Sequence, residues 1–146
     1  MIRGYFGTIG ARQRPFIDAV FHFAAISNRS FQARLLVDTG ADRTILGTLD
    51  ANRLRRQLGI DISSLSSGAP SRGVGGQTPT RIMEGVLSLD TFTRGLTLPI
   101  LHAPSALLPV PSLLGRDILS YFALFMEERT RRVLLLEPHE ADALHL

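Results

Sequence analysis

The sequence predicts a mostly β fold in a single domain, with one or two short helices. Its 146 residues suit one domain with one hydrophobic core. Apolar and polar residues alternate with a period of two, most clearly from Phe16 to Ile26, as they do in a strand with one buried face. Polar turns such as Ser27-Asn28-Arg29-Ser30 separate the strand-like segments. This combination favours strands joined by short turns.

The composition excludes several classes of function. The chain has no cysteine, which excludes disulfides, thiolate catalysis and cysteine-ligated zinc. Its four histidines are scattered, so we expect no metal site and no cofactor. All 16 basic residues are arginine, and the net charge is only +3. The basic run Arg53, Arg55 and Arg56 has no aromatic residue among its members, which favours a solvated helix face over a nucleic-acid-binding site.

No segment has the pattern of a signal peptide or of a membrane span. The first residues include Arg3, Arg12 and Arg14 but no continuous apolar core. Leu96 to Gly115 is uncharged over about the length of a membrane span, but several prolines would break a helix there. We therefore expect a cytoplasmic protein that does not insert into a membrane.

The first elements lead to one acidic residue. Residues 1–14 contain three glycines and no clear period, so we expect a flexible arm or an edge strand that orders only on a partner. In the strand from Phe16 to Ile26, residues 17, 19, 21, 23 and 25 form the apolar face. A second strand, Phe31 to Val37, ends at Asp38.

Asp38 requires an explanation because it directly follows Leu35-Leu36-Val37. Burial disfavours a charged carboxylate unless hydrogen bonds or a function compensate. Thr39 and Gly40 have the chemistry of a tight turn, since a hydroxyl can bond nearby backbone and glycine is free to adopt positive φ. The acid is therefore expected in a turn between two apolar segments.

A helix and a glycine-rich turn are expected after the acid. Thr48 or Asp50 can cap a short helix that ends at Gly59. Gly73 to Gly76 then lies near a hairpin tip before the strand from Arg81 to Thr91. These glycines fit either a plain flexible turn or backbone that closes over an extended ligand.

The remaining elements are also mostly strands. We interpret residues 87–101 as two strands around Thr93-Arg94-Gly95, followed by an extended proline-rich connection. Leu113-Leu114 predicts a buried strand that ends at Gly115, and residues 116–121 fit one or two helical turns. Residues 122–127 and 132–137 predict a closing hairpin.

Three of these segments resemble motifs of the retropepsin-like aspartic proteases, the retroviral-type single-domain relatives of pepsin. Leu36-Val37-Asp38-Thr39-Gly40-Ala41 resembles their active-site motif, and Gly73-Val74-Gly75-Gly76 resembles the glycine-rich flap tip. Leu113-Leu114-Gly115-Arg116-Asp117 resembles the segment that packs behind the active-site loop. The resemblance implies a closed β fold of the acid-protease type over residues 15–138, with an arm at 1–14 and a tail at 139–146.

The resemblance further implies an aspartic endopeptidase that acts as a two-fold homodimer on a peptide or protein. The chain has one Asp-Thr-Gly and no internal repeat, whereas this chemistry needs two carboxylates that share a proton. The family commonly closes its dimer with terminal strands, which implicates the Val-Leu-Leu-Leu run at 133–136. The implied site consists of the catalytic Asp38, Thr39 and Gly40, the substrate-binding Ala41, Asp42, Gly73, Val74, Gly75 and Gly76, and the supporting Gly115 and Arg116.

Two alternatives stay open. The resemblance implies that Asp42 pairs with Arg116 in a buried link between the acid loop and the segment Leu113 to Asp117. The alternative is a surface ion pair that contributes little to stability. The alternative to a protease is a catalytically inactive, dimeric peptide-binding module with the same fold. The intact Asp38, Thr39 and Gly40 favour hydrolysis.

Overall fold

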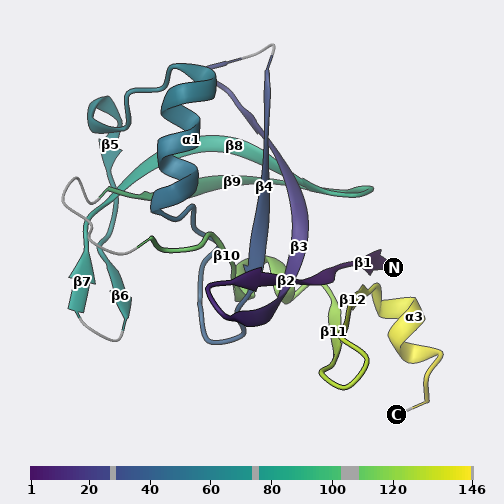
Figure 1. Ribbon diagram of the computed structural model, residues 1–146. Coiled ribbons are helices and arrows are strands. Elements are labelled where there is room, and N and C mark those ends of the chain that lie inside the picture. Colours follow the sequence, from purple (N-terminus) through teal and green to yellow (C-terminus); the bar gives the residue numbers. More distant parts are fainter. Residues whose placement is uncertain (27–28, 74–75, 103–108, 146) are drawn as a thin grey trace. The chain divides into compact units, whose positions relative to one another are not determined.

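Strands make up most of the regular structure in the computed structural model, which describes residues 1–26, 29–73, 76–102 and 109–145 (Figure 1). The chain divides into two compact units. Unit 1 comprises Met1–Asp18, Arg34–Thr44 and Leu113–Leu146, and unit 2 comprises Ala19–Ala33 and Ile45–Ser112. Strands β3 (Arg12–Phe23) and β4 (Ser30–Val37) contribute residues to both units.

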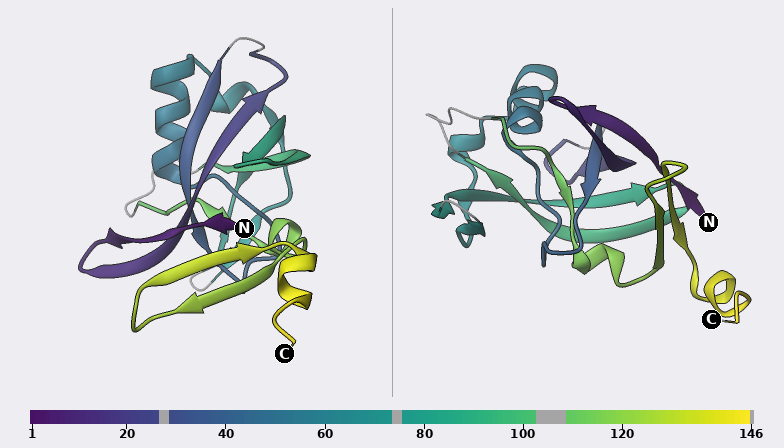
Figure 2. Two further views of the ribbon diagram at one scale, coloured as in Figure 1. Left: turned by 90° about the vertical axis from the view of Figure 1, so that its right-hand side faces the viewer. Right: turned by 60° about the horizontal axis from the view of Figure 1, so that its bottom comes forward.

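Unit 1 contains a three-stranded sheet in the order β1-β12-β11. Figure 2 shows β11 and β12 as a hairpin with β11 on the outside. In the same unit, β2 pairs with the first half of β3, and β10 runs parallel to the end of β4. The elements of unit 1 are β1 (Ile2–Arg3), β2 (Tyr5–Ile9), β10 (Leu113–Leu114), α2 (Arg116–Leu119), β11 (Ala123–Glu127), β12 (Arg132–Leu136) and α3 (Pro138–Asp142).

The expectation that residues 1–14 order only on a partner is wrong, because this segment pairs within its own chain. Ile2 lies opposite Leu135 in the β1-β12 ladder, and its side chain is 8% exposed. Gly4, between β1 and β2, donates its N–H to the Val133 carbonyl at 2.9 Å. A Cβ at Gly4 would lie 2.3 Å from the Phe16 carbonyl oxygen. This glycine therefore permits close packing rather than flexibility.

The closing hairpin predicted over 122–127 and 132–137 is confirmed as β11 and β12. Helix α3 was not predicted: it begins at Pro138 and covers the start of the expected tail. Its first turn has a capping box. The Glu137 side chain accepts the backbone N–H of Glu140, and the Glu140 side chain accepts the backbone N–H of Glu137. Proline at the first helical position and a capping box are strong local start signals.

Unit 2 is organised around the long β8-β9 hairpin. Strand β8 also pairs with the second half of β3, over Val20 to Phe23, and with β5. The elements of unit 2 are α1 (Thr48–Leu58), the 3₁₀ helix η1 (Ile62–Ser64), β5 (Ser66–Ser67), β6 (Ser71–Gly73), β7 (Gly76–Thr78), β8 (Thr80–Leu89) and β9 (Phe92–Leu101). The apolar face predicted for the first strand is buried at residues 17, 19, 21 and 23, whereas residue 25 lies beyond the strand end and is exposed.

The turn predicted at Thr93-Arg94-Gly95 lies elsewhere. Leu89 and Phe92 are directly paired, so the hairpin turns at Asp90 and Thr91. Asp90 adopts a left-handed conformation with φ of 53°, which aspartate tolerates better than most residues. Gly95 instead lies within β9, opposite Val86.

Helix α1 starts differently from the prediction. Its N-cap is Gly47, and no side chain caps the helix. Thr48 Oγ1 accepts a hydrogen bond from the Val110 N–H at 2.9 Å, and Asp50 Oδ2 accepts one from the Ser112 hydroxyl at 2.5 Å. The two candidate caps therefore fix the segment that precedes β10 instead of the first turn of their own helix.

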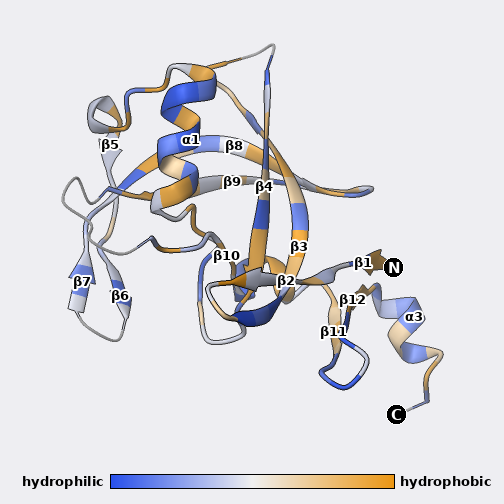
Figure 3. Cartoon of the chain, viewed as in Figure 1, coloured by the Kyte–Doolittle hydropathy of each residue, from blue (hydrophilic) through white to orange (hydrophobic). Residues whose placement is uncertain are grey.

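The end and the buried face of α1 are as predicted. Gly59 ends the helix with φ of 67° and donates its N–H to the Arg55 carbonyl at 3.0 Å. Ala51 and Leu54 are buried. Figure 3 shows hydrophilic and hydrophobic bands along α1, as expected of a helix with one buried face. In the ranges that the structure describes, no helix is long and apolar enough to cross a membrane.

Candidate active site

Asp38 lies in a tight turn directly after β4. Its N–H donates to the Leu114 carbonyl at 3.1 Å, and its carbonyl accepts the Ala41 N–H at 3.2 Å. Carboxylate oxygen Oδ1 accepts the Gly40 N–H at 2.9 Å. Oxygen Oδ2 has no hydrogen-bond partner within the described part of the chain. The backbone thus fixes this half-buried carboxylate and leaves one oxygen available.

Thr39 and Gly40 complete the turn in a way that the sequence did not fully predict. Gly40 does not adopt positive φ, so that expectation is wrong. A Cβ at Gly40 would lie 3.3 Å from Asp38 Oδ1, so a side chain at this position would crowd the carboxylate. Thr39 is exposed, and its hydroxyl has no partner among the residues described here.

The segment from Leu113 to Asp117 holds the acid turn through backbone contacts. Strand β10 pairs in parallel with Leu36 and Val37. The Arg116 N–H donates to the Ala41 carbonyl at 2.8 Å, and the Asp117 N–H donates to the Asp42 carbonyl at 3.1 Å. These bonds continue the β10-β4 pairing past Asp38 to the start of α2.

Gly115 allows this close approach. A Cβ at this position would lie 2.4 Å from the Arg43 carbonyl carbon and 2.6 Å from its oxygen. Both neighbours are backbone atoms, so a side chain could fit only if one segment moved. Gly115 thus supports the turn by having no side chain.

The predicted Asp42–Arg116 link is wrong for this structure. Both side chains are exposed, and in the described residues no ion pair joins them. Only the backbone of each residue takes part in the contacts behind the turn. An ion pair between two exposed side chains contributes little to stability, so exposure of both residues removes the physical reason for the predicted link.

Asp117 and Thr44 make the side-chain contact that sequence reasoning assigned to other residues. Asp117 Oδ1 accepts the Thr44 N–H at 2.9 Å, the Thr44 hydroxyl at 2.8 Å and the Ile118 N–H at 2.9 Å. The Thr44 hydroxyl in turn accepts the Gly115 N–H at 3.1 Å. Thr44 is fully buried, so these bonds satisfy polar groups that have no access to water. The feature of the sequence that could have indicated this contact is the position of Thr44, a polar residue directly before the buried Ile45-Leu46 run.

The glycine-rich segment forms the end of the short β6-β7 hairpin in unit 2. Gly73 lies opposite Gly76, which has φ of 119°. A Cβ at either position would meet no atom within 4 Å, so the chain is open there. Val74 and Gly75, the other two predicted residues of this segment, lie outside the described residues. The predicted hairpin is present.

Comparison with solved structures identifies the fold. EIAV protease, solved in complex with the inhibitor HBY-793, matches with a TM-score of 0.52 at 24% identity over 78% of this chain and 92% of that chain. A retropepsin-like aspartic protease from Rickettsia conorii matches with a TM-score of 0.55 at 19% identity over 82% of this chain and 88% of that chain. No protein-family model and no curated protein matches the sequence. The chain therefore has the retropepsin-like fold, as the three motifs predict.

Proposed function

We propose that this protein is an aspartic endopeptidase in which a two-fold homodimer brings together Asp38 of each copy. The observation that carries the proposal is the geometry of this carboxylate, whose backbone and Oδ1 are fixed while Oδ2 is available. The fold that this chain shares with two aspartic proteases supports the same reading. Because each chain has a single Asp-Thr-Gly, the second carboxylate must come from a second copy.

The two carboxylates activate a water molecule and the peptide carbonyl together. Adjacent like charges resist being ionised at the same time, so the pair holds one proton. The ionised carboxylate takes a proton from water, whose oxygen attacks the carbonyl carbon, while the protonated carboxylate donates a hydrogen bond to the carbonyl oxygen. The tetrahedral intermediate then breaks its C–N bond as a proton passes to the leaving nitrogen.

The neighbouring residues take supporting roles in this proposal. The free Thr39 hydroxyl bonds across the dimer axis, and Gly40 leaves room for water and substrate beside the carboxylate. Ala41 and Asp42 line the path of the extended peptide. The segment Gly73-Val74-Gly75-Gly76 acts as a flap whose backbone bonds the substrate main chain, a role that the open space around Gly73 and Gly76 supports.

Asp38→Asn tests the chemistry directly. The amide has nearly the shape of the carboxylate but cannot take a proton from water, so hydrolysis of a peptide library should disappear while folding persists. The wild type should be inhibited by a statine-type mimic, whose hydroxyl stands in for the attacking water. A correctly folded Asp38→Asn protein that still cleaves would falsify the mechanism.

Mixing the two proteins adds a control that no single variant provides. Random exchange of equal amounts leaves about a quarter of the dimers with two intact Asp38 residues, so activity should fall to about a quarter of the wild-type value. A fall to only one half would mean that each copy works alone. A wild type that binds peptides but cleaves none would favour the inactive binding module.

A further inference from the structure

Helix α1 carries a buried acid, Asp50, that lies outside the acid turn. Asp50 is 9% exposed. Its Oδ1 accepts from Arg53 Nη1 at 2.6 Å, and its Oδ2 accepts from the Ser112 hydroxyl at 2.5 Å. A buried carboxylate is costly unless both of its oxygens have partners. The two donors therefore fix the direction of this side chain, and they lie on α1 itself and on the residue directly before β10.

Ser112 connects this carboxylate to the start of β10. It is 2% exposed, and its hydroxyl also accepts the Gly47 N–H at 2.9 Å. Two residues earlier, the Val110 N–H donates to Thr48 Oγ1 at 2.9 Å. A Cβ at Gly47 would lie 2.0 Å from the Val110 carbonyl oxygen, so the two backbones are in direct contact. The start of α1 thus fixes the chain just before β10.

Arg53 connects the same carboxylate to β4. Its Nη2 donates to the Gln32 carbonyl at 2.9 Å. Its guanidinium carbon lies 4.7 Å from the centre of the Phe31 ring, within the range of a cation–π contact. Strand β4 continues from these two residues to Val37 and then to the acid turn. One side chain of α1 therefore holds the first half of the strand that leads to the candidate catalytic acid.

We infer that Asp50 is a positioning residue for the proposed reaction, because it joins the two strands that hold the catalytic acid. This inference rests on the function proposed above. Through Arg53 it is linked to β4, and through Ser112 to the chain before β10. The two strands pair in parallel, and the Asp38 N–H donates to the Leu114 carbonyl at 3.1 Å. Strand β10 has two residues, which is too short to hold its place by its own ladder.

The alternative is a contact that only stabilises its own helix. Asp61 provides the comparison within the same unit, because its Oδ1 accepts from the Ser63 hydroxyl at 2.6 Å and from the Ser63 N–H at 3.1 Å. Both of these donors lie in η1, which Asp61 itself caps. Loss of this carboxylate should therefore affect the start of η1 and leave β4 and β10 in place.

Asp50→Asn tests the inference through the kinetics of peptide cleavage. The amide keeps the shape of the carboxylate but presents an N–H to one of the two donors, so the contact with Arg53 or with Ser112 is lost. A displaced Asp38 impairs the transition state more than ground-state binding. We expect kcat to fall about tenfold or more and KM to change less than about twofold. The matched control, Asp61→Asn, should leave both constants unchanged.

Amide exchange measured by NMR tests the same link without hydrolysis. The Asp38 N–H bonds the Leu114 carbonyl directly, so its protection factor should fall about tenfold in Asp50→Asn. Its protection is compared with that of amides in the β11-β12 ladder, because a loss of global stability lowers protection in both places. Asp61→Asn should leave the ratio of the two protection factors unchanged.

Arg53→Gln provides a second variant if Asp50→Asn does not fold. The guanidinium donates to Asp50 and to β4 from two separate nitrogens, whereas glutamine has one shorter amide. The contact between Asp50 and Ser112 stays, and only the link to β4 is broken. This variant should show the same fall in kcat with KM little changed. Arg56→Gln, an exposed position on the same helix, should have neither effect.

Failure of the inference and failure of the proposed function give different results. Unchanged kcat and unchanged protection at Asp38 in folded Asp50→Asn overturn the inference and leave the proposed chemistry standing. A rise in KM with kcat preserved also overturns it, because the contact then acts on peptide binding. A wild type that cleaves no peptide refutes the endopeptidase. In that case protection at Asp38 that falls in Asp50→Asn still supports the link, and protection that persists overturns it.

Discussion

At Asp38 the protein positions a carboxylate almost entirely with backbone groups. Its two backbone hydrogen bonds and the Gly40 N–H orient the side chain without an ion pair. Behind the turn, the Asp117 side chain makes the link between the acid loop and the later segment that was predicted for the Asp42–Arg116 pair. Its single oxygen Oδ1 accepts three hydrogen bonds, two of them from the buried Thr44.

The contrast between Asp117 and its neighbour Arg116 gives a matched pair of substitutions. Asp117→Ala leaves the buried Thr44 N–H and hydroxyl without their acceptor, which should lower the free energy of unfolding by about 1–3 kcal/mol. Arg116→Ala removes an exposed side chain with no partner in the described residues, so the change should stay within about 0.5 kcal/mol. Denaturant unfolding measures both. Equal losses would show that Arg116 has a buried partner after all.

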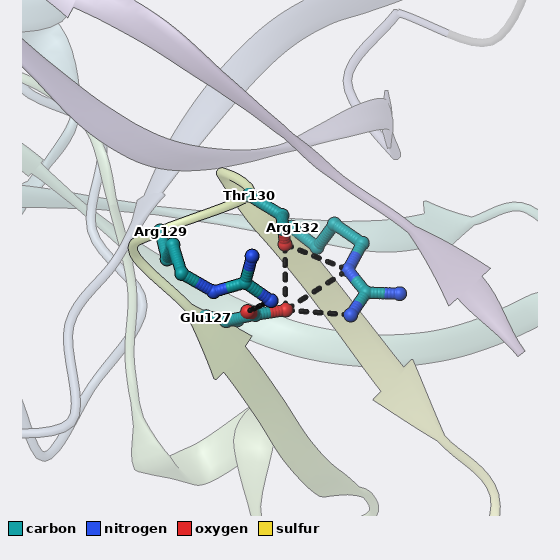
Figure 4. A network of polar contacts seen from close by, with 4 residues as sticks. All are labelled: Glu127, Arg129, Thr130 and Arg132. Atoms are coloured by element: carbon teal, nitrogen blue, oxygen red, sulfur yellow. Dashed lines mark hydrogen bonds and ion pairs between the residues drawn. The ribbon is translucent and has the colours of Figure 1, made fainter.

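At the scale of elements, the β11-β12 hairpin combines an apolar strand with a charged turn. Glu127, Arg129, Thr130 and Arg132 form one polar network at the closed end of the hairpin (Figure 4). The Arg132 guanidinium also lies 5.5 Å from the centre of the Phe125 ring. The network fixes the turn that sets the register of β11.

This network predicts a local effect of acid. Because the folded-state pKa of Glu127 is lowered, first by the Thr130 hydrogen bond and then by Arg132, its stabilising contribution is complete above the pKa of an unfolded glutamate. The contribution is lost as the pH falls through the lower, folded-state pKa. The protection factors of the amides in the turn, which correct for the intrinsic pH dependence of exchange, should therefore fall on acidification, and Glu127→Gln should remove that fall. Glu128→Gln, in the same turn, should keep it; a pH response unchanged by Glu127→Gln would contradict the assignment.

At the scale of the whole molecule, one chain carries one candidate catalytic acid, so activity becomes a property of the assembly. Specific activity should rise more steeply than linearly with protein concentration near the dissociation constant of the dimer and then level off. Peptide cleavage and sedimentation followed over the same dilution series test this. Full specific activity from a strictly monomeric sample would contradict the dimer.

Removal of the C-terminal strand tests how unit 1 depends on its sheet. A chain that ends before Arg132 loses β12, the central strand, together with Val133 and Leu135, which are both fully buried. Strands β1 and β11 then have no partner in their sheet, so unit 1 should unfold rather than merely release monomers. Circular dichroism and thermal melting measure this. A truncated chain with unchanged melting would show that β12 is dispensable.

The sequence by itself determined the features that depend on local chemistry. The strand periodicity of β3, the helix stop at Gly59, the hairpin at residues 122–137 and the acid turn at Asp38 all follow from patterns within a few residues. The retropepsin-like fold followed as well, because three separate motifs occur in the family's order. The capping box before α3 belongs to this class too, since its signal lies within residues 137–140.

Only the tertiary structure decided which distant groups meet. Thr44 and Asp117 are 73 positions apart in the chain, and nothing near Asp117 indicates that its side chain, rather than the side chain of Arg116, bonds the acid loop. The pairing of β1 with β12 likewise joins the two ends of the chain, so the glycines of the first segment could not be distinguished from those of a flexible arm. Local patterns fix the conformation of a segment, but a buried polar group or a strand edge finds its partner only when packing brings the backbone groups together.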